Sequence, residues 1–295
     1  SVAYLPALIV SLTLTTYNYI IDTISDLEEM GIKKVVLIYF SPTGTTQKAI
    51  IAFGAGMGLP FEKIDLTTPK ARQSFKRSFS KDELVVAGLP VYAGRLPWYL
   101  DDFFSGLEGD TTPAVASVMY GNREYDDALI ELKLRLEERG FIVKAGAAFI
   151  GEHTFSNKIA TGRPNTNDLA VIADLGKKAL VSIVNNISAK PVFKGNYPFV
   201  AKGYDPSATS PTRARIVTTE SCTLCRLCAE ECPWGVINID DCKTIDYAKC
   251  SRCFRCIKNC PIGAKQVTDE TFLNFLPQFE ARLNANRCEP ELFLP

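Results

Sequence analysis

Two blocks of cysteines with identical spacing constrain the C-terminal part of this chain more than any other feature. The run CTLCRLCAEECP begins at Cys222, and the run CSRCFRCIKNCP begins at Cys250, 28 positions later. Each run has the form C-x2-C-x2-C-x3-C-P, and a glycine follows the proline two residues later. Nine of the ten cysteines lie in residues 222–260, and none occurs in the first 221 residues. The repeat and the change in composition indicate an internal duplication within a separate C-terminal domain.

This spacing is typical of bacterial iron–sulfur sites, in which the fourth cysteine of one run ligates the cluster held by the other run. The predicted ligand sets are therefore crossed between the two blocks. One [4Fe–4S] cluster is expected on Cys222, Cys225, Cys228 and Cys260, and a second on Cys250, Cys253, Cys256 and Cys232.

Three other interpretations of these cysteines fit the spacing less well. A zinc ribbon uses two CxxC pairs about 15–20 residues apart instead of tight triplets. A disulfide framework requires an oxidising compartment, and structural core cysteines would not repeat with a trailing proline. Cys242 and Cys288 lie outside the pattern and are interpreted as small buried hydrophobic residues. Oxygen-sensitive clusters and unpaired thiols favour the reducing cytoplasm.

Short apolar runs alternate with amphipathic stretches between residues 33 and 187. This β-α alternation predicts an α/β fold with a doubly wound parallel sheet. Five strands fit the flavodoxin-like order 2-1-3-4-5. Strands are predicted at residues 35–40, 61–65, 84–88, 114–120 and 141–150, and helices at residues 45–53, 98–104, 125–139 and 167–187.

The first predicted strand is followed by the hydroxyl-rich segment SPTGTT, residues 41–46, and then directly by a helix. Hydroxyl groups, a glycine and a helix N-terminus together favour an anion. The segment lacks the lysine of a P-loop and the glycine spacing of a dinucleotide site. It therefore suits a phosphate monoester held by neutral donors, and the alternative is a hydroxyl-rich helix cap without a ligand.

Two further loops follow the carboxyl ends of predicted strands, where open α/β sheets bind ligands. One is GLPVYAGRLP, residues 88–97, and the other is YGNREYD, residues 120–126. Each contains a glycine, which lets the backbone approach a flat ring, and aromatic side chains. Tyr92, Tyr120 and Tyr125 are candidates for stacking on an isoalloxazine, and the alternative for each is core packing.

SPTGTT resembles the FMN phosphate loop of flavodoxins, and PVYAGRLP, YGNREYDD and the closing EPELF resemble an anaerobe family. In that family a flavodoxin-like domain is fused to a C-terminal two-cluster ferredoxin domain. The resemblance covers about residues 31–295 and implies FMN as a cofactor. It implies phosphate binding by Ser41, Thr43, Gly44, Thr45 and Thr46, ring contacts from Pro90, Val91, Tyr92, Ala93 and Gly94, and closure of the other side by Tyr120, Gly121, Asn122, Tyr125 and Asp126.

One departure from flavodoxins concerns charge. Flavodoxins commonly carry an acidic surface around the flavin, whereas Arg95 and Arg123 lie in the two ring loops here. This difference predicts an altered flavin potential, or an anionic substrate or partner. By analogy, the backbone near Ala93 faces flavin N5.

The predicted organisation has five parts. Residues 1–30 form an N-terminal extension, 31–187 the flavodoxin-like domain, 188–213 a proline-rich linker that packs on a surface, 214–268 the α+β two-cluster ferredoxin domain, and 269–295 a C-terminal helix and tail. The first 21 residues are uncharged and apolar but contain several hydroxyl side chains. They are interpreted as a packed helix, as an arm over an apolar face, or as residues preceding a start at Met30, more than as a membrane span.

Three functions are compatible with this organisation. The first is electron transfer between two [4Fe–4S] clusters and FMN, with a redox protein as partner. The second is FMN-dependent reduction of a small-molecule substrate, for which His153, the only histidine, is the candidate proton donor. The third is a docking scaffold that has lost FMN. Lys+Arg and Asp+Glu both number 33, so a nucleic acid is not an expected partner.

Overall fold

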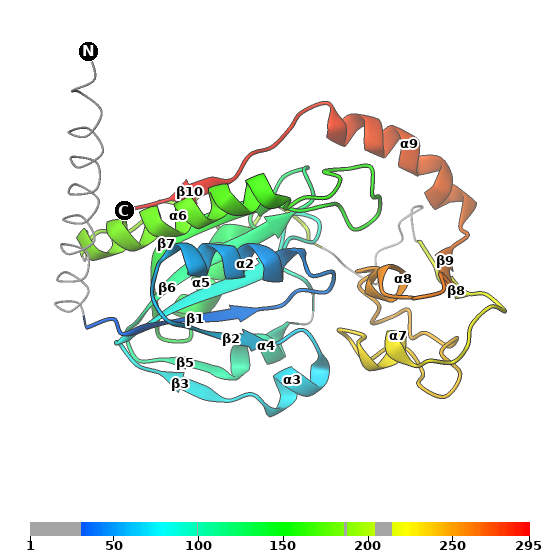
Figure 1. The fold of residues 1–295 in the computed structure, drawn as a ribbon, viewed down its shortest axis with the longest axis horizontal. Helices are drawn as coiled ribbons and strands as arrows, with labels where there is room; N and C mark the ends of the chain where they lie inside the picture. The colour runs from blue at the N-terminus through cyan, green and yellow to red at the C-terminus, as the bar shows by residue number, and fades with distance from the viewer. Residues whose placement is uncertain (1–30, 99, 186–187, 204–213) are drawn as a thin grey trace, which may run out of the picture.

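The computed structural model describes residues 31–98, 100–185, 188–203 and 214–295, which form a large α/β domain beside a smaller cysteine-rich domain (Figure 1). The interpretations of residues 1–30, and of the second half of the predicted linker, lie outside the described residues. Within the described residues, none of the helices combines the length and the apolar character that a membrane span requires.

The large domain is built on the parallel sheet that the sequence predicts. Its strands pair in the order β2-β1-β4-β6-β7, which is the order 2-1-3-4-5 when the five are counted along the chain. The flavodoxin-like fold class is therefore confirmed. These strands are β1 (Lys34–Tyr39), β2 (Phe61–Asp65), β4 (Glu83–Pro90), β6 (Thr112–Tyr120) and β7 (Phe141–Ile150).

A sixth strand, β10 (Glu291–Phe293), joins this sheet from the far end of the chain. It pairs antiparallel with β7, with Phe293 opposite Gly146, so the C-terminal tail returns to the first domain (Figure 1). The sequence analysis predicted five strands and missed β10, because three residues are too few to show an alternation of apolar and polar side chains. A separate two-stranded sheet, β3 (Arg77–Phe79) with β5 (Leu107–Gly109), was also not predicted, for the same reason.

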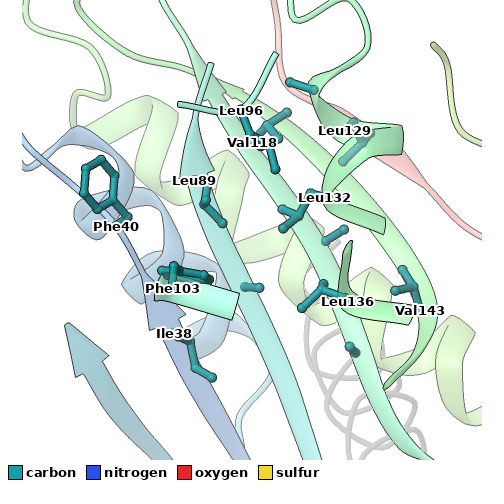
Figure 2. Packing of buried hydrophobic residues seen from close by; sticks show 14 of the residues in the cluster. Ile38, Phe40, Leu89, Leu96, Phe103, Val118, Leu129, Leu132, Leu136 and Val143 are labelled. Carbon is teal, nitrogen blue, oxygen red and sulfur yellow. The ribbon is translucent and has the colours of Figure 1, made fainter. Parts of the chain in front are cut away.

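Helices cover both faces of the sheet. α2 (Thr45–Gly56) and α6 (Thr166–Asn185) pack together on one face, where a Cβ at Gly176 would lie 2.0 Å from the carbonyl oxygen of Phe53. The opposite face is covered by α4 (Asp101–Ser105) and α5 (Ala128–Glu137), while α3 (Pro69–Ser74) lies near α4. Figure 2 shows the packing on this second face, where Leu129, Leu132 and Leu136 of α5 meet Val118 and Val143 of the sheet.

Two helices begin later than predicted. α5 starts at Ala128 and not at residue 125, because Asp126 has a φ of 43°, which does not continue a right-handed helix. α4 covers Asp101–Ser105, whereas residues 98–104 were predicted. α6 begins as expected behind a polar cap. Asn165 Oδ1 accepts from Asp168 N at 3.0 Å, and Asp168 Oδ2 accepts from Asn165 N at 2.9 Å.

The cysteine-rich domain has little regular structure. It contains the antiparallel pair β8 (Ile216–Thr218) and β9 (Lys265–Val267) and two short helices, α7 (Leu227–Glu230) and α8 (Arg255–Lys258). The predicted C-terminal helix is α9 (Glu270–Asn284), which Asp269 caps by accepting from Phe272 N at 2.8 Å. Phe272 lies in the core of this domain.

The linker packs on the large domain along residues 188–203, as expected. Asp127, which is fully buried, accepts four hydrogen bonds from this segment. The donors are Asn196 N at 2.8 Å, Asn196 Nδ2 at 3.0 Å, Val200 N at 2.8 Å and Ala201 N at 2.7 Å. Burial raises the pKa of Asp127, but these hydrogen bonds bring it below its ordinary value. The carboxylate therefore anchors the linker.

Candidate functional site

The hydroxyl-rich loop joins β1 to α2 at the carboxyl edge of the sheet. Gly44 has a φ of 82° and stands at the N-terminus of α2, with no side-chain capping hydrogen bond. Ser41 is buried and its Oγ accepts from Gln47 N at 2.9 Å, so this hydroxyl supports the loop from within. Thr43, Thr45 and Thr46 instead line a cavity beyond the loop. Neutral donors and a helix N-terminus thus meet at the cavity wall.

This strand-end cavity has a volume of about 500 Å³, within the usual range for ligand pockets. Its walls come from the ends of four strands: the loop after β1, residues 90–93 after β4, Tyr120 and Gly121 after β6, and residues 151–155 after β7. The predicted phosphate loop and both predicted ring loops therefore meet at one cavity. It is the position at which a doubly wound sheet binds a ligand.

Several predicted ring contacts do not line the cavity. Tyr125 is 1% exposed, and its ring packs edge-on against Tyr120 at 5.4 Å between centroids. Asn122 is also buried and donates to the carbonyl oxygens of Leu283 at 2.7 Å and Asn286 at 2.9 Å. Tyr125 is thus a core residue, and Asn122 holds the end of α9. Gly94 and Asp126 also do not line the cavity, and a Cβ at Gly94 would lie 2.3 Å from the Asp126 carboxylate.

The two arginines of the ring loops differ in position. Arg95 forms two bonds to Glu131, at 2.7 and 3.0 Å, and its guanidinium lies 3.8 Å from the centroid of Phe199. It is held against α5 and the linker and does not line the cavity. Arg123 does line the cavity, where it pairs with Asp126. Of the two arginines, only Arg123 is placed to interact electrostatically with a ligand in the cavity.

His153 lies in the wall of the strand-end cavity. Its ring centroid is 5.4 Å from Phe155 and 5.1 Å from Phe279, and Nδ1 accepts from Phe155 N at 3.0 Å. Burial lowers the pKa of His153 to about 4. The imidazole is therefore neutral at pH 7, with its proton on Nε2. Gly121 permits this position, since a Cβ there would lie 2.4 Å from His153 Cδ2.

The cysteines surround two further cavities in the crossed arrangement. Cys242 is 1% exposed, as its interpretation as a small buried residue predicts, and it also lies in the wall of the first cavity. We call the first cavity site I and the second site II. Site I is lined by Cys222, Cys225, Cys228 and Cys260, and site II by Cys232, Cys250, Cys253 and Cys256.

The duplication is visible in the backbone of the two sites. Non-glycine residues with left-handed φ angles of 55–65° separate the cysteines of each triplet, and they recur 28 positions apart. Such residues turn the chain tightly around a centre, so the three sulfurs of a triplet face the same cavity. The paired positions are Leu224 with Arg252, and Arg226 with Phe254.

The donor set fits an iron–sulfur cluster. Four thiols around one cavity are the ligand set of a [4Fe–4S] cluster, whereas no three His, Cys, Asp or Glu side chains among the described residues are arranged to hold a single metal ion. Burial raises the pKa of Cys228 to about 11 and of Cys253 to about 12. Because these thiols are protonated at neutral pH, metal binding at them releases protons.

The two sites differ in exposure. Cys225 of site I is exposed and its three partners are half-buried, whereas all four cysteines of site II are buried. Site II also borders the strand-end cavity, because Ser251 and Arg252, which lie between the site II cysteines, line that cavity. Site II is therefore the inner site, and site I faces solvent.

Three contacts fix site II against the large domain. The ring of Trp234 lies 5.4 Å from Phe40, the last apolar residue before the hydroxyl-rich loop. Arg72 is 4% exposed and donates from Nη2 to the carbonyl oxygen of Pro233 at 2.9 Å. Arg255 of α8 donates from Nη1 to the carbonyl oxygen of Pro42. Sequence reasoning missed all three, since nothing in their local pattern distinguishes them from surface residues.

Comparison with known protein families identifies a similarity in the cysteine-rich domain. The family described as a 4Fe-4S binding domain matches residues 215–238, which contain the first cysteine block. The chain therefore combines a flavodoxin-like α/β domain with a 4Fe–4S domain. No curated protein sequence matched the chain.

Solved structures similar to the chain include several flavodoxins. A flavodoxin from the domain Archaea is 14% identical, with a TM-score of 0.34, covering 51% of this chain and 98% of its own. Oxidised Flavodoxin 2 from Bacillus cereus is 14% identical, with a TM-score of 0.35, covering 50% and 97%. A Fusobacterium nucleatum flavodoxin bound to flavin mononucleotide is 11% identical, with a TM-score of 0.35, covering 52% and 99%. The fold assignment rests on the strand order and not on these likenesses.

Proposed function

We propose that this protein transfers electrons between an external one-electron carrier and FMN, through two [4Fe–4S] clusters held in sites I and II. The observation that carries the proposal is the position of Ser251 and Arg252. Both belong to the loop that carries the site II cysteines, and both line the strand-end cavity. A cluster in site II is thereby adjacent to any ligand in that cavity.

The residues of the strand-end cavity suit FMN. Thr43, Thr45 and Thr46 and the start of α2 offer neutral donors to a phosphate monoester. Residues 90–93 and 120–121 line the same cavity and offer surface for a flat ring. Arg255 lies behind the loop, and its Nη2 pairs with Glu231 at 2.9 Å. Its Nη1 holds the carbonyl oxygen of Pro42, and its buried Nε has no hydrogen-bond partner among the described residues.

The exposure of the cysteines indicates which site an external partner can reach. Site I is open to solvent and site II is buried between site I and the cavity. We therefore place a redox protein partner at site I, with FMN at the inner end. FMN supplies the ability to collect two electrons, while the clusters exchange electrons singly. The chain itself supplies ligands, spacing and exclusion of water. Its cluster ligands require a reducing compartment.

The test begins with anaerobic purification and measurement of iron, sulfide and flavin per chain. The proposal predicts about eight irons, eight sulfides and one FMN. A Cys225→Ala variant should then block reduction of the flavin by an external one-electron donor, while direct photoreduction of the flavin continues. Cys288→Ala is the matched control, because Cys288 lies outside both sites. Rapid flavin reduction in the Cys225 variant would contradict the proposed route.

A second candidate function is the reduction of a small substrate by the flavin. The position of His153 favours it, since this neutral imidazole lies in the cavity wall with a proton on Nε2. Such a group is a suitable proton donor to a substrate beside a reduced flavin. The reduced protein is screened for substrate-dependent reoxidation, and His153→Ala then shows whether turnover depends on the imidazole. The flavin-free scaffold remains the alternative if no flavin can be extracted.

A further inference from the structure

Lys265 is a buried cation in the wall of site I. It is 2% exposed, which is rare for a lysine. Its Nζ donates to Thr218 Oγ1 at 2.7 Å and to the carbonyl oxygen of Cys242. Both acceptors are neutral, and none of the ion pairs in the described part of the chain involves Lys265. An ammonium group has three donors, so one donor is not used by these acceptors.

A buried ammonium is costly unless an opposite charge compensates for it. The cavity that Lys265 lines carries thiols, while the Asp241 carboxylate lies within electrostatic range of Lys265 but does not line that cavity. Burial raises the pKa of the Cys228 thiol, and the nearby Lys265 charge acts against this rise. A [4Fe–4S] cluster with four thiolates is a dianion when oxidised, and it gains one more negative charge when reduced. A cluster in site I would therefore supply a counter-charge inside the cavity that Lys265 lines.

The duplicated domain provides an internal comparison. Lys265 lies 28 positions after Ile237, which is the spacing of the two cysteine blocks. Ile237 is buried and lines site II, just as Lys265 lines site I. The two cavities thus have equivalent ligands and backbone turns. They differ in charge at two equivalent positions, where site I carries the buried Lys265 and the exposed Arg226 and site II carries Ile237 and Phe254.

We propose that Lys265 makes the cluster in site I easier to reduce than the cluster in site II. The proposal rests on the proposed two-cluster function. A positive charge in a poorly solvated site stabilises the more negative, reduced cluster, which raises its reduction potential. Site I, the solvent-facing site, then holds the first electron that enters the pair. The flavin draws this electron inward through site II.

The experiment is an anaerobic redox titration followed by electron paramagnetic resonance, on the full chain with its clusters. The wild-type protein is expected to show two distinct midpoint potentials. Lys265→Met should lower the higher midpoint potential by at least 59 mV, which is a tenfold change in the reduction equilibrium of a one-electron couple. Lys265→Arg retains the charge and should preserve most of the difference. Ile237→Met is the matched neutral change in site II and should leave the difference intact.

Iron content separates failure of this inference from failure of the proposed function. About four irons or fewer per wild-type chain would remove the two-cluster function itself. Eight irons with an unchanged titration in Lys265→Met, or with equal shifts of both potentials, would overturn the role of Lys265 alone. If Lys265→Met does not retain iron, the wild-type titration decides, because two indistinguishable potentials would contradict the proposal.

Discussion

Arg72 Nη2 and the carbonyl oxygen of Pro233 are joined by a 2.9 Å hydrogen bond across the two domains. The same guanidinium donates from Nη1 to the carbonyl oxygens of Leu66 at 3.2 Å and Thr67 at 2.8 Å, and from Nε to Asp102. One buried side chain therefore contacts three segments: the residues that follow β2, helix α4, and Pro233, which follows the site II ligand Cys232. Docking of the cysteine-rich domain depends on it.

Replacing Arg72 with Met should lower the free energy of unfolding by about 2–4 kcal/mol, because three buried carbonyl oxygens lose their donor. The change should also loosen the docked domain, which is measured as faster proteolysis between the two domains. Lys178→Met on the exposed part of α6 is the control, since its partner Asp174 is also exposed. It should change stability by less than about 0.5 kcal/mol. Equal effects from both variants would contradict the anchoring role.

His153 should make stability sensitive to mild acid. Burial lowers its pKa to about 4 in the folded protein, below the value of about 6.5 in an unfolded chain. The unfolded state therefore binds more protons between these values. The neutral state of His153 therefore gives its full stability above pH 6.5, and this stability is lost as the pH falls toward 4, by about 1 kcal/mol at pH 5.5.

This pH dependence is measured by chemical unfolding under anaerobic conditions at pH 7.5 and 5.5. His153→Phe retains aromatic packing against Phe155 and Phe279 and removes the titrating group. The variant should lose less stability than the wild type between the two pH values. An identical loss in both proteins would show that other groups cause the acid sensitivity.

Arg255→Gln should weaken FMN binding roughly 5–10-fold, which corresponds to about 1–1.4 kcal/mol. The reason is the loss of the hydrogen bond that holds the carbonyl oxygen of Pro42 in the phosphate loop, and of the ion pair with Glu231 that positions the guanidinium. Titration of flavin-depleted protein with FMN, followed by fluorescence quenching, gives the dissociation constants. Lys243→Gln is the control, because Lys243 pairs with Glu220 on the surface of the cysteine-rich domain. An unchanged constant in Arg255→Gln would remove Arg255 from the flavin site.

Asp127→Ala should release the linker from the large domain. Four donors from residues 196–201 lose their acceptor, and the expected cost is about 3–5 kcal/mol. Because the pKa of Asp127 lies below its ordinary value, its contribution is present at neutral pH and is lost as the pH falls through the folded pKa.

Limited proteolysis tests this prediction directly, since cleavage within residues 188–203 should become faster in the variant. Asp174→Ala on the exposed part of α6 is the matched control and should leave the cleavage rate unchanged. Protection of the linker in Asp127→Ala would indicate that other contacts hold it.

Features that depend on a short, continuous stretch of sequence could be predicted without the structure. Four of the five parallel strands follow from short apolar runs, whereas β2 has the largely charged sequence FEKID and gives only a weak signal. The crossed cysteine grouping follows from spacing alone. The sequence did not reveal which loop residues reach the cavity. Tyr125 and Asn122 lie in a loop with the expected composition, yet one packs in the core and the other holds α9. Contacts such as Arg72 with Pro233 join residues 161 positions apart and leave no periodicity to detect.

β10 changes how the cysteine-rich domain is attached. Because the chain leaves the large domain after residue 203 and returns to the edge of its sheet at Glu291–Phe293, the smaller domain is inserted within the larger one. Two covalent connections, one at each end, restrict any swinging or sliding of an inserted unit. On the proposed function, this double attachment would keep site II beside the strand-end cavity, so electrons would cross between them without a domain having to diffuse into place.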